Sequence, residues 1–155
     1  GNKSELAVGY CTLYGDMNGG LSVIGDLYKT SVFELCDWID NESSSSCRND
    51  FFLPEKGDII GSEIRNKPPS AELRPEQLDS DSLPDYFTLD PILKGLIEHH
   101  LPTEVLIEKG FDQTIVNKVA NLLKNAEFKR YQAPPLLKIS NQAFGSGWKK
   151  PIASR

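Results

Sequence analysis

The chain has 155 residues, of which 39% are hydrophobic and 25% are charged, and its formal net charge is −5. This composition is typical of one soluble globular domain and excludes collagenous, low-complexity and membrane-spanning chains, since no apolar run approaches the roughly 18 residues of a bilayer span. Cys11, Cys36 and Cys47 are odd in number and lack C-x-x-C spacing, so neither a disulfide framework nor a zinc site is expected, and we predict a cytoplasmic protein without a membrane partner.

The charges are distributed unevenly along the chain. Residues 128–155 form a basic tail without any Asp or Glu, whereas residues 1–127 carry all 22 acidic residues and a net charge of −11. A basic tail on an acidic body suits a negatively charged ligand, such as a dinucleotide or a polyphosphate, held where the two meet. A nucleic-acid binder would carry a broader positive excess, so no nucleic-acid partner is expected.

Residues 4–13 predict the first helix, which Asn2 or Ser4 can cap. The free N–H groups and the dipole of a helix start favour an anion, and Glu5 would lie beside such a phosphate site, where a bridging Mg²⁺ could bind. The alternative is a capped surface helix with no ligand. Apolar or aromatic side chains available for packing are Leu6, Val8 and Tyr10.

The next segment contains glycine-rich turns and a second helix. Gly15, Gly19 and Gly20 place Asp16 in a flexible turn, and residues 21–24 predict a short strand. From Tyr28 onward the apolar spacing predicts a helix with one buried face, bordered by Trp38. That face comprises Tyr28, Val32, Leu35, Cys36 and Ile39.

Residues 41–50 predict a polar loop, and a short helix is expected near residues 62–65. A proline- and acid-rich segment follows at residues 66–85. Prolines forbid a regular helix across it, and a loop of this length in a compact domain is typically a lid or binding loop, the alternative being disorder. We predict a mobile lid.

The last third of the chain predicts helices. Asp90 is expected to cap a helix with Pro91 at its first position, and Pro102 to end it. A short helix at residues 103–109 would stop at Gly110, and Asp112 would cap the next, whose apolar face includes Ile115, Val116, Val119, Leu122, Leu123 and Ala126. His99 and His100 project in different directions, which favours surface residues over a metal pair.

An ordered set of motifs across nearly the whole chain resembles the NAD⁺ synthetase family, and most closely its long, glutamine-dependent branch. The motifs are GNKSE at residues 1–5, YGD at 14–16, KPPSAELRP at 67–75, DSLP at 81–84, EFKRYQAPP at 127–135, KIS at 138–140, FG at 144–145 and PI at 151–152. Any one of them is weak alone, but their shared order and rough spacing is specific.

The resemblance implies an α/β fold of the adenine-nucleotide-hydrolase (Rossmann-like) class, with residues 1–155 as the predominantly helical C-terminal half of a ligase domain. It implies a ligase that activates the nicotinate carboxylate of deamido-NAD⁺ with ATP and Mg²⁺, releases pyrophosphate and lets ammonia, drawn from glutamine, displace AMP. The family's pyrophosphate loop would lie in an upstream half, and an amidase domain before that. We therefore expect a homo-oligomeric parent enzyme and an inactive isolated segment.

The resemblance also implies roles for single residues. Glu5 matches a Mg²⁺ ligand that borders the dinucleotide, while Lys29 and Ser70 match ATP-binding residues, Ser70 from the lid. The expected deamido-NAD⁺ contacts are Glu5, Tyr10, Asp16, Lys129 and Lys138, of which Asp16 either orders its turn or touches substrate. Lys129 is treated as an exposed lysine that adds little to stability.

Two positions depart from the short, ammonia-using branch. Leu13 and Gly20 stand where those enzymes carry a substrate-contacting Lys and an Asp, so these contacts are not carried over, and the glutamine-dependent branch is favoured. The competing function is a non-catalytic helical module that folds or assembles with a partner, with residues 103–125 as the candidate contact. A GMP synthetase is a weaker alternative, because residues 67–75 do not resemble one.

Overall fold

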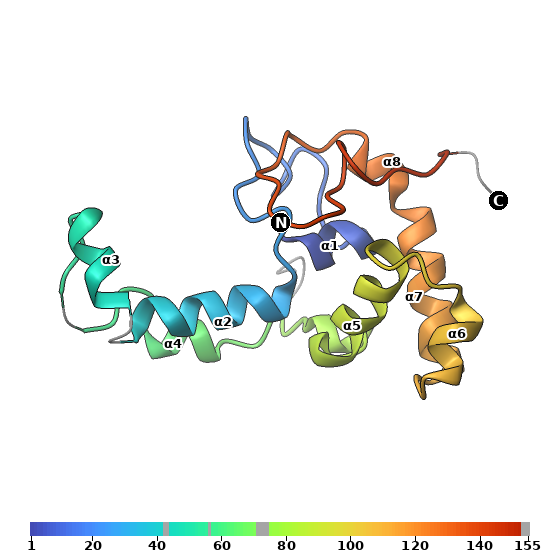
Figure 1. Cartoon of the computed structure of the whole chain (residues 1–155), viewed down its shortest axis with the longest axis horizontal. Coiled ribbons are helices and arrows are strands. Elements are labelled where there is room, and N and C mark those ends of the chain that lie inside the picture. The colour runs from blue at the N-terminus through green and yellow to red at the C-terminus, as the bar shows by residue number, and fades with distance from the viewer. Residues whose placement is uncertain (42–43, 56, 71–74, 153–155) are drawn as a thin grey trace.

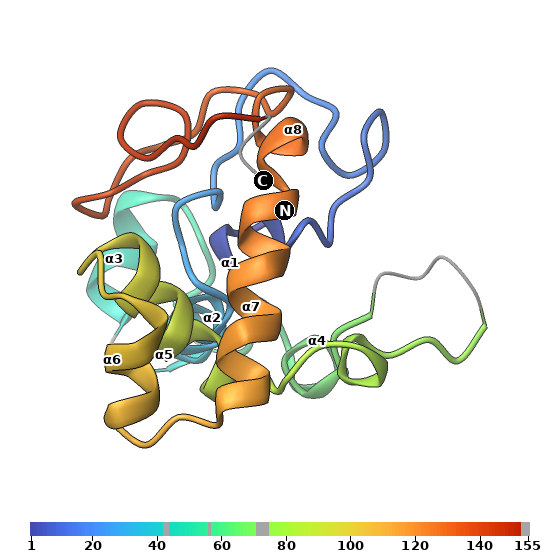
Figure 2. The same cartoon turned by 90° about the vertical axis from the view of Figure 1, so that its right-hand side faces the viewer.

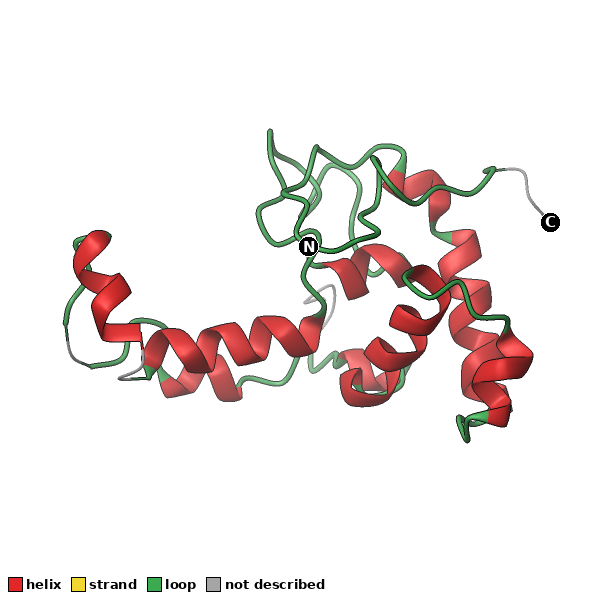
Figure 3. Ribbon diagram, viewed as in Figure 1, coloured by secondary structure: helices red, strands yellow, loops and turns green. Residues whose placement is uncertain are grey.

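The computed structural model describes residues 1–41, 44–55, 57–70 and 75–152. Parts of the predicted polar loop (42–43), of the lid (71–74) and of the basic tail (153–155) therefore lie outside the described residues. Within the described ranges the chain is helical, and its pairing of extended backbone is limited to two isolated bridges, Ser22 with Leu136 and Phe144 with Trp148 (Figure 3). The strand predicted at residues 21–24 is thus wrong, because only Ser22 finds a partner.

The elements follow one another as helices joined by loops (Figure 1). They are α1 (Lys3–Val8), α2 (Lys29–Asp40), α3 (Ser45–Asp50), α4 (Ser62–Asn66), a short 3-10 helix (Asp79–Asp81), α5 (Tyr86–Ile97), α6 (Thr103–Glu108), α7 (Gln113–Asn125) and α8 (Glu127–Arg130). The short helix predicted near residues 62–65 and the pair around Gly110 are confirmed, whereas the predicted loop at 41–50 contains α3.

The core lies where α5 and α7 pack against α1, with α6 packed against α5 and α7 (Figure 2). The fully buried side chains are Leu89, Ile92, Leu93 and Ile97 of α5, Leu106 of α6, and Val116, Val119 and Leu123 of α7. Gly95 permits the close approach of α5 to α6, since a Cβ there would lie 2.7 Å from Leu106 Cδ2. Burying this set supplies the main stabilisation, at about 1.5–3 kcal/mol per large aliphatic side chain.

Two helix boundaries differ from those predicted. The first helix ends at Val8 rather than near residue 13, because Gly9 adopts a left-handed conformation with φ of 76° and its N–H closes the last turn on the carbonyl of Glu5. The fifth begins at Tyr86, where Asp85 accepts the N–H of Thr88, so Asp90 is an interior residue and not the N-cap. It ends at Ile97, before Pro102.

An arm made of α2, α3 and α4 extends from this core (Figure 1). The predicted buried face of α2 is confirmed only in part. Tyr28, at the N-cap, is buried, and Val32, Cys36 and Ile39 are half-buried, whereas Leu35 and the bordering Trp38 are 38% and 43% exposed. Charged groups organise the tip instead. The Asp40 carboxylate accepts the N–H groups of Ile59–Gly61, and Arg48 donates to the carbonyl of Gly57 over 2.8 Å.

The basic tail folds back over α1 and α8. Ser22 N–H donates to the carbonyl of Pro135 over 2.8 Å, and the rings of Phe144 and Trp148 meet edge to face with centroids 5.5 Å apart. The buried Arg130 guanidinium stacks on both rings and donates to the carbonyls of Leu6 and Ala7, which satisfies the C-terminal end of α1. In the part of the chain described, none of these helices is long and apolar enough to span a bilayer.

Candidate functional site

A carboxylate and an ammonium meet where α1 and α2 begin. Glu5 Oε1 pairs with Lys29 Nζ at 2.8 Å, and both side chains are less than one-fifth exposed. The other carboxylate oxygen, Oε2, accepts the N–H of Asn2 at 3.0 Å, while Asn2 Oδ1 accepts the N–H of Glu5. This capping box confirms the predicted start of the helix and holds the Glu5 carboxylate against the helix N-terminus.

The first turn of α2 is capped by side chains from other helices. Tyr28 makes no side-chain cap, and the N–H of Lys29 instead donates to Ser4 Oγ at 2.9 Å. Asp90 Oδ2 accepts both the N–H and the hydroxyl of Thr30 at 2.8 Å, and Asp90 Oδ1 accepts the Ser4 hydroxyl at 2.5 Å. Burial raises the pKa of Asp90, against the hydrogen bonds from Ser4 and Thr30 that favour its ionised form.

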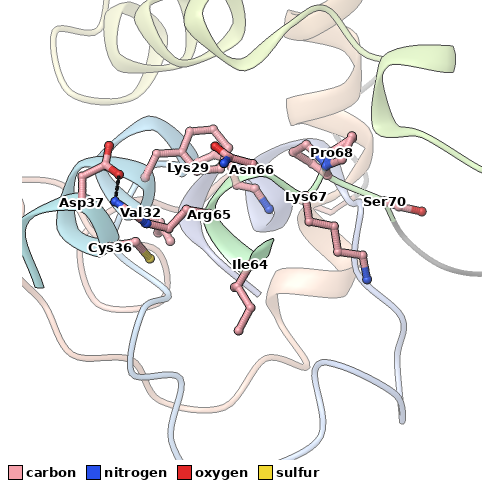
Figure 4. Close-up of a pocket in the computed structure, with 12 residues that line it drawn as sticks. Lys29, Val32, Cys36, Asp37, Ile64, Arg65, Asn66, Lys67, Pro68 and Ser70 are labelled. Carbon is pink, nitrogen blue, oxygen red and sulfur yellow. Dashed lines mark hydrogen bonds and ion pairs between the residues drawn. The ribbon is translucent and has the colours of Figure 1, made fainter. Parts of the chain in front are cut away.

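A cavity of about 330 Å³ lies between α2, α4 and residues 67–70 (Figure 4). Lys29 lines one side, and Lys67 and Ser70 line the strip of chain that follows α4. Arg65 pairs with Asp37 at 3.1 Å on the same wall. Arg65 also pairs with Asp40 at 3.1 Å. The structure therefore brings Lys29 and Ser70, which are 41 positions apart in the sequence, to one cavity whose charged groups are mostly ion-paired.

The Ser70 segment is tied to the 3-10 helix. Ser70 Oγ donates to the carbonyl of Gln77, and the N–H of Asp79 donates to the carbonyl of Pro69 at 3.0 Å. Asp79 is buried, and its Oδ2 accepts the Tyr86 hydroxyl at 2.6 Å. Burial raises the pKa of Tyr86, with the contact to Asp79 acting in the same direction, so this tyrosine stays a hydrogen-bond donor. Both ends of the lid thus have fixed points within the described residues.

A second carboxylate borders the same helix start as Glu5. A Cβ at Gly1 would lie 3.5 Å from Glu5 Oε2 and 3.8 Å from Asp16 Oδ2, so the two side chains face one small space beside Gly1. Asp16 Oδ1 also accepts the N–H of Thr12, which orders the turn that Asp16 closes. Ordering of the turn, one of the two roles expected for Asp16, is therefore observed.

The remaining predicted residues lie at the C-terminal end of α1 and on the tail. Lys129 Nζ donates to the carbonyls of Gly9 and Cys11 at 2.6 and 2.8 Å, so the expectation that this lysine contributes little to the fold is wrong. The Tyr10 hydroxyl contacts Ser82 of the lid. Lys138 is exposed on the tail, apart from the Lys29 cavity.

Sequence reasoning missed a buried ionic network centred on Lys3. Its ammonium lies 3.0 Å from Asp26 Oδ1, 3.1 Å from Glu98 Oε1 and 2.7 Å from Ser140 Oγ. Although burial opposes ionisation, the N–H groups of Ser140 and Ile139 hold the pKa of Asp26 below its usual value. A lysine in the first turn of a helix is ordinarily exposed, and no local pattern signals its burial.

The carboxylates of Glu5 and Asp16 are the candidate ligands for a divalent cation. Among the residues described, no group of three or more His, Cys, Asp or Glu side chains is arranged to hold a metal. Mg²⁺, however, is commonly bound by one or two carboxylates together with phosphate oxygens and water. Glu5 and Asp16 fit that sparser donor set and do not form an all-protein cage.

Comparison with known proteins gives consistent matches. A family model described as NAD synthase matches residues 1–133. The chain is 52% identical over 153 residues to a glutamine-dependent NAD(+) synthetase of Synechocystis sp., and 46% identical over 155 residues to one of Thermotoga maritima. The two matches include 99% and 100% of this chain but only 25% of each relative. The chain therefore spans about a quarter of the length of these relatives.

A solved structure agrees in fold. The crystal structure of a glutamine-dependent NAD(+) synthetase from Cytophaga hutchinsonii superposes with a TM-score of 0.67 at 24% identity, over 99% of this chain and 23% of that one. The helices described above are therefore arranged as in a corresponding part of that protein.

Proposed function

The chain belongs to the NAD synthase family, and we propose that it is the C-terminal part of the ligase domain of a glutamine-dependent NAD⁺ synthetase. In this proposal the longer enzyme amidates deamido-NAD⁺ to NAD⁺ with ATP through an adenylated intermediate. The complete domain has the Rossmann-like α/β fold of adenine-nucleotide hydrolases, to which residues 1–155 contribute a predominantly helical half. The extent and identity of the matches to enzymes of that name support the proposal.

One observation carries the nucleotide part of the proposal. Lys29 and Ser70 line a single cavity of about 330 Å³, with the Glu5 carboxylate paired to Lys29 at its edge. We propose that Lys29 donates to a phosphate of ATP and that Ser70 contacts ATP from the lid. Lys67 adds a further positive charge to the same cavity, which favours a polyphosphate, whereas the Arg65 charge is balanced by Asp37 and Asp40.

Mg²⁺ is part of the proposal, with Glu5 as the residue that would hold it and Asp16 as the neighbouring carboxylate. When bound, the ion would neutralise phosphate oxygens as pyrophosphate departs. The N–H of Asn2 holds Glu5 Oε2 at the helix start, and a cation bound to Oε1 would take the place of the Lys29 ammonium, which would then be released toward a phosphate.

We propose that deamido-NAD⁺ lies toward the other end of α1, against Tyr10, Asp16, Lys129 and, from the tail, Lys138. A lysine ammonium has three N–H donors, and the carbonyls of Gly9 and Cys11 engage two of those of Lys129. The third can reach a dinucleotide phosphate without breaking either contact. Lys129 would thus serve both the fold and the ligand.

The surface of the arm bears on how the protein assembles. The arm exposes large apolar side chains, including Trp38, Phe51 and Phe52, the last of them 98% exposed. Such a surface favours contact with another protein surface, which supports a homo-oligomer. We propose that this enzyme is cytoplasmic. Light scattering of the full-length protein tests this. A monomer at micromolar concentration would contradict it.

The same exposed surface favours the alternative of a non-catalytic module that acts by assembly. The deciding assay follows NAD⁺ and AMP formation by the full-length protein with deamido-NAD⁺, ATP, Mg²⁺ and either glutamine or ammonium. The ligase proposal expects both products, with glutamine as an effective donor. ATP binding without AMP release under either donor would overturn it in favour of the module.

A paired substitution tests the metal assignment. Glu5→Gln keeps the shape of the side chain and the bond from Asn2 but removes the charge, so the Mg²⁺ concentration at half-maximal rate should rise. Glu108→Gln, at the exposed end of α6, is the matched control and should leave it unchanged. An unchanged Mg²⁺ dependence in Glu5→Gln would remove Glu5 from the metal site.

A further inference from the structure

Asp90 is a buried carboxylate whose hydrogen bonds serve another helix. It lies in the interior of α5 and is 4% exposed. Its own helix does not need it as a cap, because Asp85 already accepts the N–H of Thr88. Instead, Asp90 Oδ2 accepts the N–H and hydroxyl of Thr30, and Asp90 Oδ1 accepts the hydroxyl of Ser4. One carboxylate therefore joins α5 to the starts of α1 and α2.

These bonds determine where α2 begins. A helix start leaves N–H groups without intrahelical partners, and a negative charge there is also favoured by the helix dipole. The first two N–H groups of α2 belong to Lys29 and Thr30, and their acceptors are Ser4 Oγ and Asp90 Oδ2. Ser4 is held in turn by its own bond to Asp90. Without Asp90, both acceptors are lost or free to rotate.

The Lys29 side chain rests on the same helix as Asp90. Its ammonium lies 5.4 Å from the centroid of the Tyr86 ring, one turn before Asp90 on α5, and 2.8 Å from Glu5 Oε1. The backbone of Lys29 is thus anchored through Ser4 and Asp90, and its ammonium is positioned by Tyr86 and Glu5. The position of this cation at the cavity depends on how α2 is seated against α5.

We propose that Asp90 is a positioning residue for Lys29: its carboxylate seats the first turn of α2 against α1 and α5, and thereby aims the Lys29 ammonium at the nucleotide cavity. The expected effect on the KM for ATP rests on the proposed function. The expected change in the surroundings of the Lys29 ammonium is independent of that function.

The kinetic test is a double-mutant cycle in the full-length protein with Asp90→Asn, Lys29→Ala and their combination. Lys29→Ala should raise the KM for ATP by about tenfold to a hundredfold, the range for a hydrogen bond to a charged group. Asp90→Asn should raise it severalfold, and it should add nothing further in the Lys29→Ala background, because its effect passes through Lys29. The KM for deamido-NAD⁺ should change much less.

A matched control separates positioning from stability. Asp112→Ala removes the N-cap of α7, a helix whose packing partners in the described chain do not include α2, so it should lower the thermal midpoint without raising the KM for ATP. If Asp90→Asn does not fold, Thr30→Val replaces it, since that change removes only the hydroxyl bond to Asp90. A rise in the KM for ATP in Asp112→Ala equal to that in Asp90→Asn would assign Asp90 a merely structural role.

A second readout does not need catalysis. The rate at which an acylating reagent labels the Lys29 ammonium, followed by mass spectrometry, should rise severalfold in Asp90→Asn and stay unchanged in Asp112→Ala. If Lys29→Ala leaves the KM for ATP unchanged but the labelling shift is seen, the proposed nucleotide role fails and the positioning stands. Full multiplication of the two KM effects, or unchanged labelling, overturns the positioning itself.

Discussion

At the scale of single residues, this molecule buries charges in groups. Lys3 is completely buried, and its ammonium is shared among Asp26, Glu98 and Ser140. It also lies 4.7 Å from the centroid of the Tyr28 ring. Asp26 lies in the loop before α2, Glu98 follows the end of α5, and Ser140 belongs to the tail. One ammonium therefore joins three separate segments of the chain. Such a group is stabilising only while every member is present.

Removing the central cation should therefore be costly. We expect Lys3→Ala to lower the free energy of unfolding by about 3–5 kcal/mol, because Asp26 is left buried without its counter-charge. Denaturant unfolding of the full-length protein measures the change. Lys118→Ala, on the exposed face of α7, is the control and should change stability by less than about 0.5 kcal/mol. Equal effects of the two changes would contradict a structural role for the network.

Acid should weaken the same network. The folded-state pKa of Asp26 lies below the ordinary value of 3.8, so its ionised form is favoured by folding. The resulting stability is present above the unfolded pKa and is lost as the pH falls through the folded pKa. Unfolding free energies measured downward from pH 5 should fall less steeply in Asp26→Asn than in the unchanged protein. Parallel pH profiles would show that Asp26 contributes nothing to acid sensitivity.

At the scale of elements, the lid illustrates how a loop can be fixed at its ends. Residues 67–70 line the cavity beside Lys29, and the 3-10 helix holds the other end through the contacts of Asp79 with Pro69 and Tyr86. Ser82 also contacts the Tyr10 hydroxyl. The lid is thus attached both to α5 and to the segment after α1. Ordering of the lid by a ligand can therefore affect both of these segments.

The prediction of a ligand-responsive lid follows from these attachments. On adding a non-hydrolysable ATP analogue with Mg²⁺ to the full-length protein, amide exchange should slow in residues 67–70 and 75–78. Exchange in residues 79–83, where Asp81, Ser82 and Leu83 already donate to backbone carbonyls, should change little. Equal protection of both parts with and without nucleotide would indicate a rigid structural loop.

At the scale of the whole molecule, the core and the arm are built differently. The core is apolar and closed by α5, α6 and α7, whereas the arm carries its apolar side chains outward and its polar contacts inward. A segment with Phe51 and Phe52 exposed gains little from folding alone. The exposed tip is therefore the part of the arm that fits the proposed assembly, whereas α2 and α4 line the cavity.

The printed chain on its own should be a poor nucleotide binder. It spans about a quarter of the length of its curated relatives, and the family's pyrophosphate loop is expected outside it. Calorimetric titration of the isolated 155-residue chain with ATP and Mg²⁺ should therefore show weak or no binding, and the synthetase assay no turnover. Tight, Mg²⁺-dependent binding by this chain would mean that the nucleotide site has been misplaced.

Features that depend on neighbours within one helical turn could be predicted from the sequence. The capping box of Asn2 and Glu5, the cap at Asp112 and the helices on either side of Gly110 involve residues at most a few positions apart, where propensity and hydrogen bonding act locally. The family is likewise identified by the order of motifs along the chain. The meeting of Lys29 and Ser70 at one cavity agrees with their predicted roles but does not test them.

Burial was decided only by the tertiary structure. The sequence predicted Asp90 as the cap of its own helix, which is wrong, and did not indicate that it accepts from Ser4, 86 positions away. The partners of Lys3 include residues 95 and 137 positions away. The apolar stripe of α2 has the period of a buried face, yet within the described residues Leu35 of that stripe is exposed. Periodicity indicates which side chains share a face of a helix, whereas the burial of that face depends on which distant segments pack against it. A charged side chain can be buried only where the tertiary structure also places a group of opposite charge beside it.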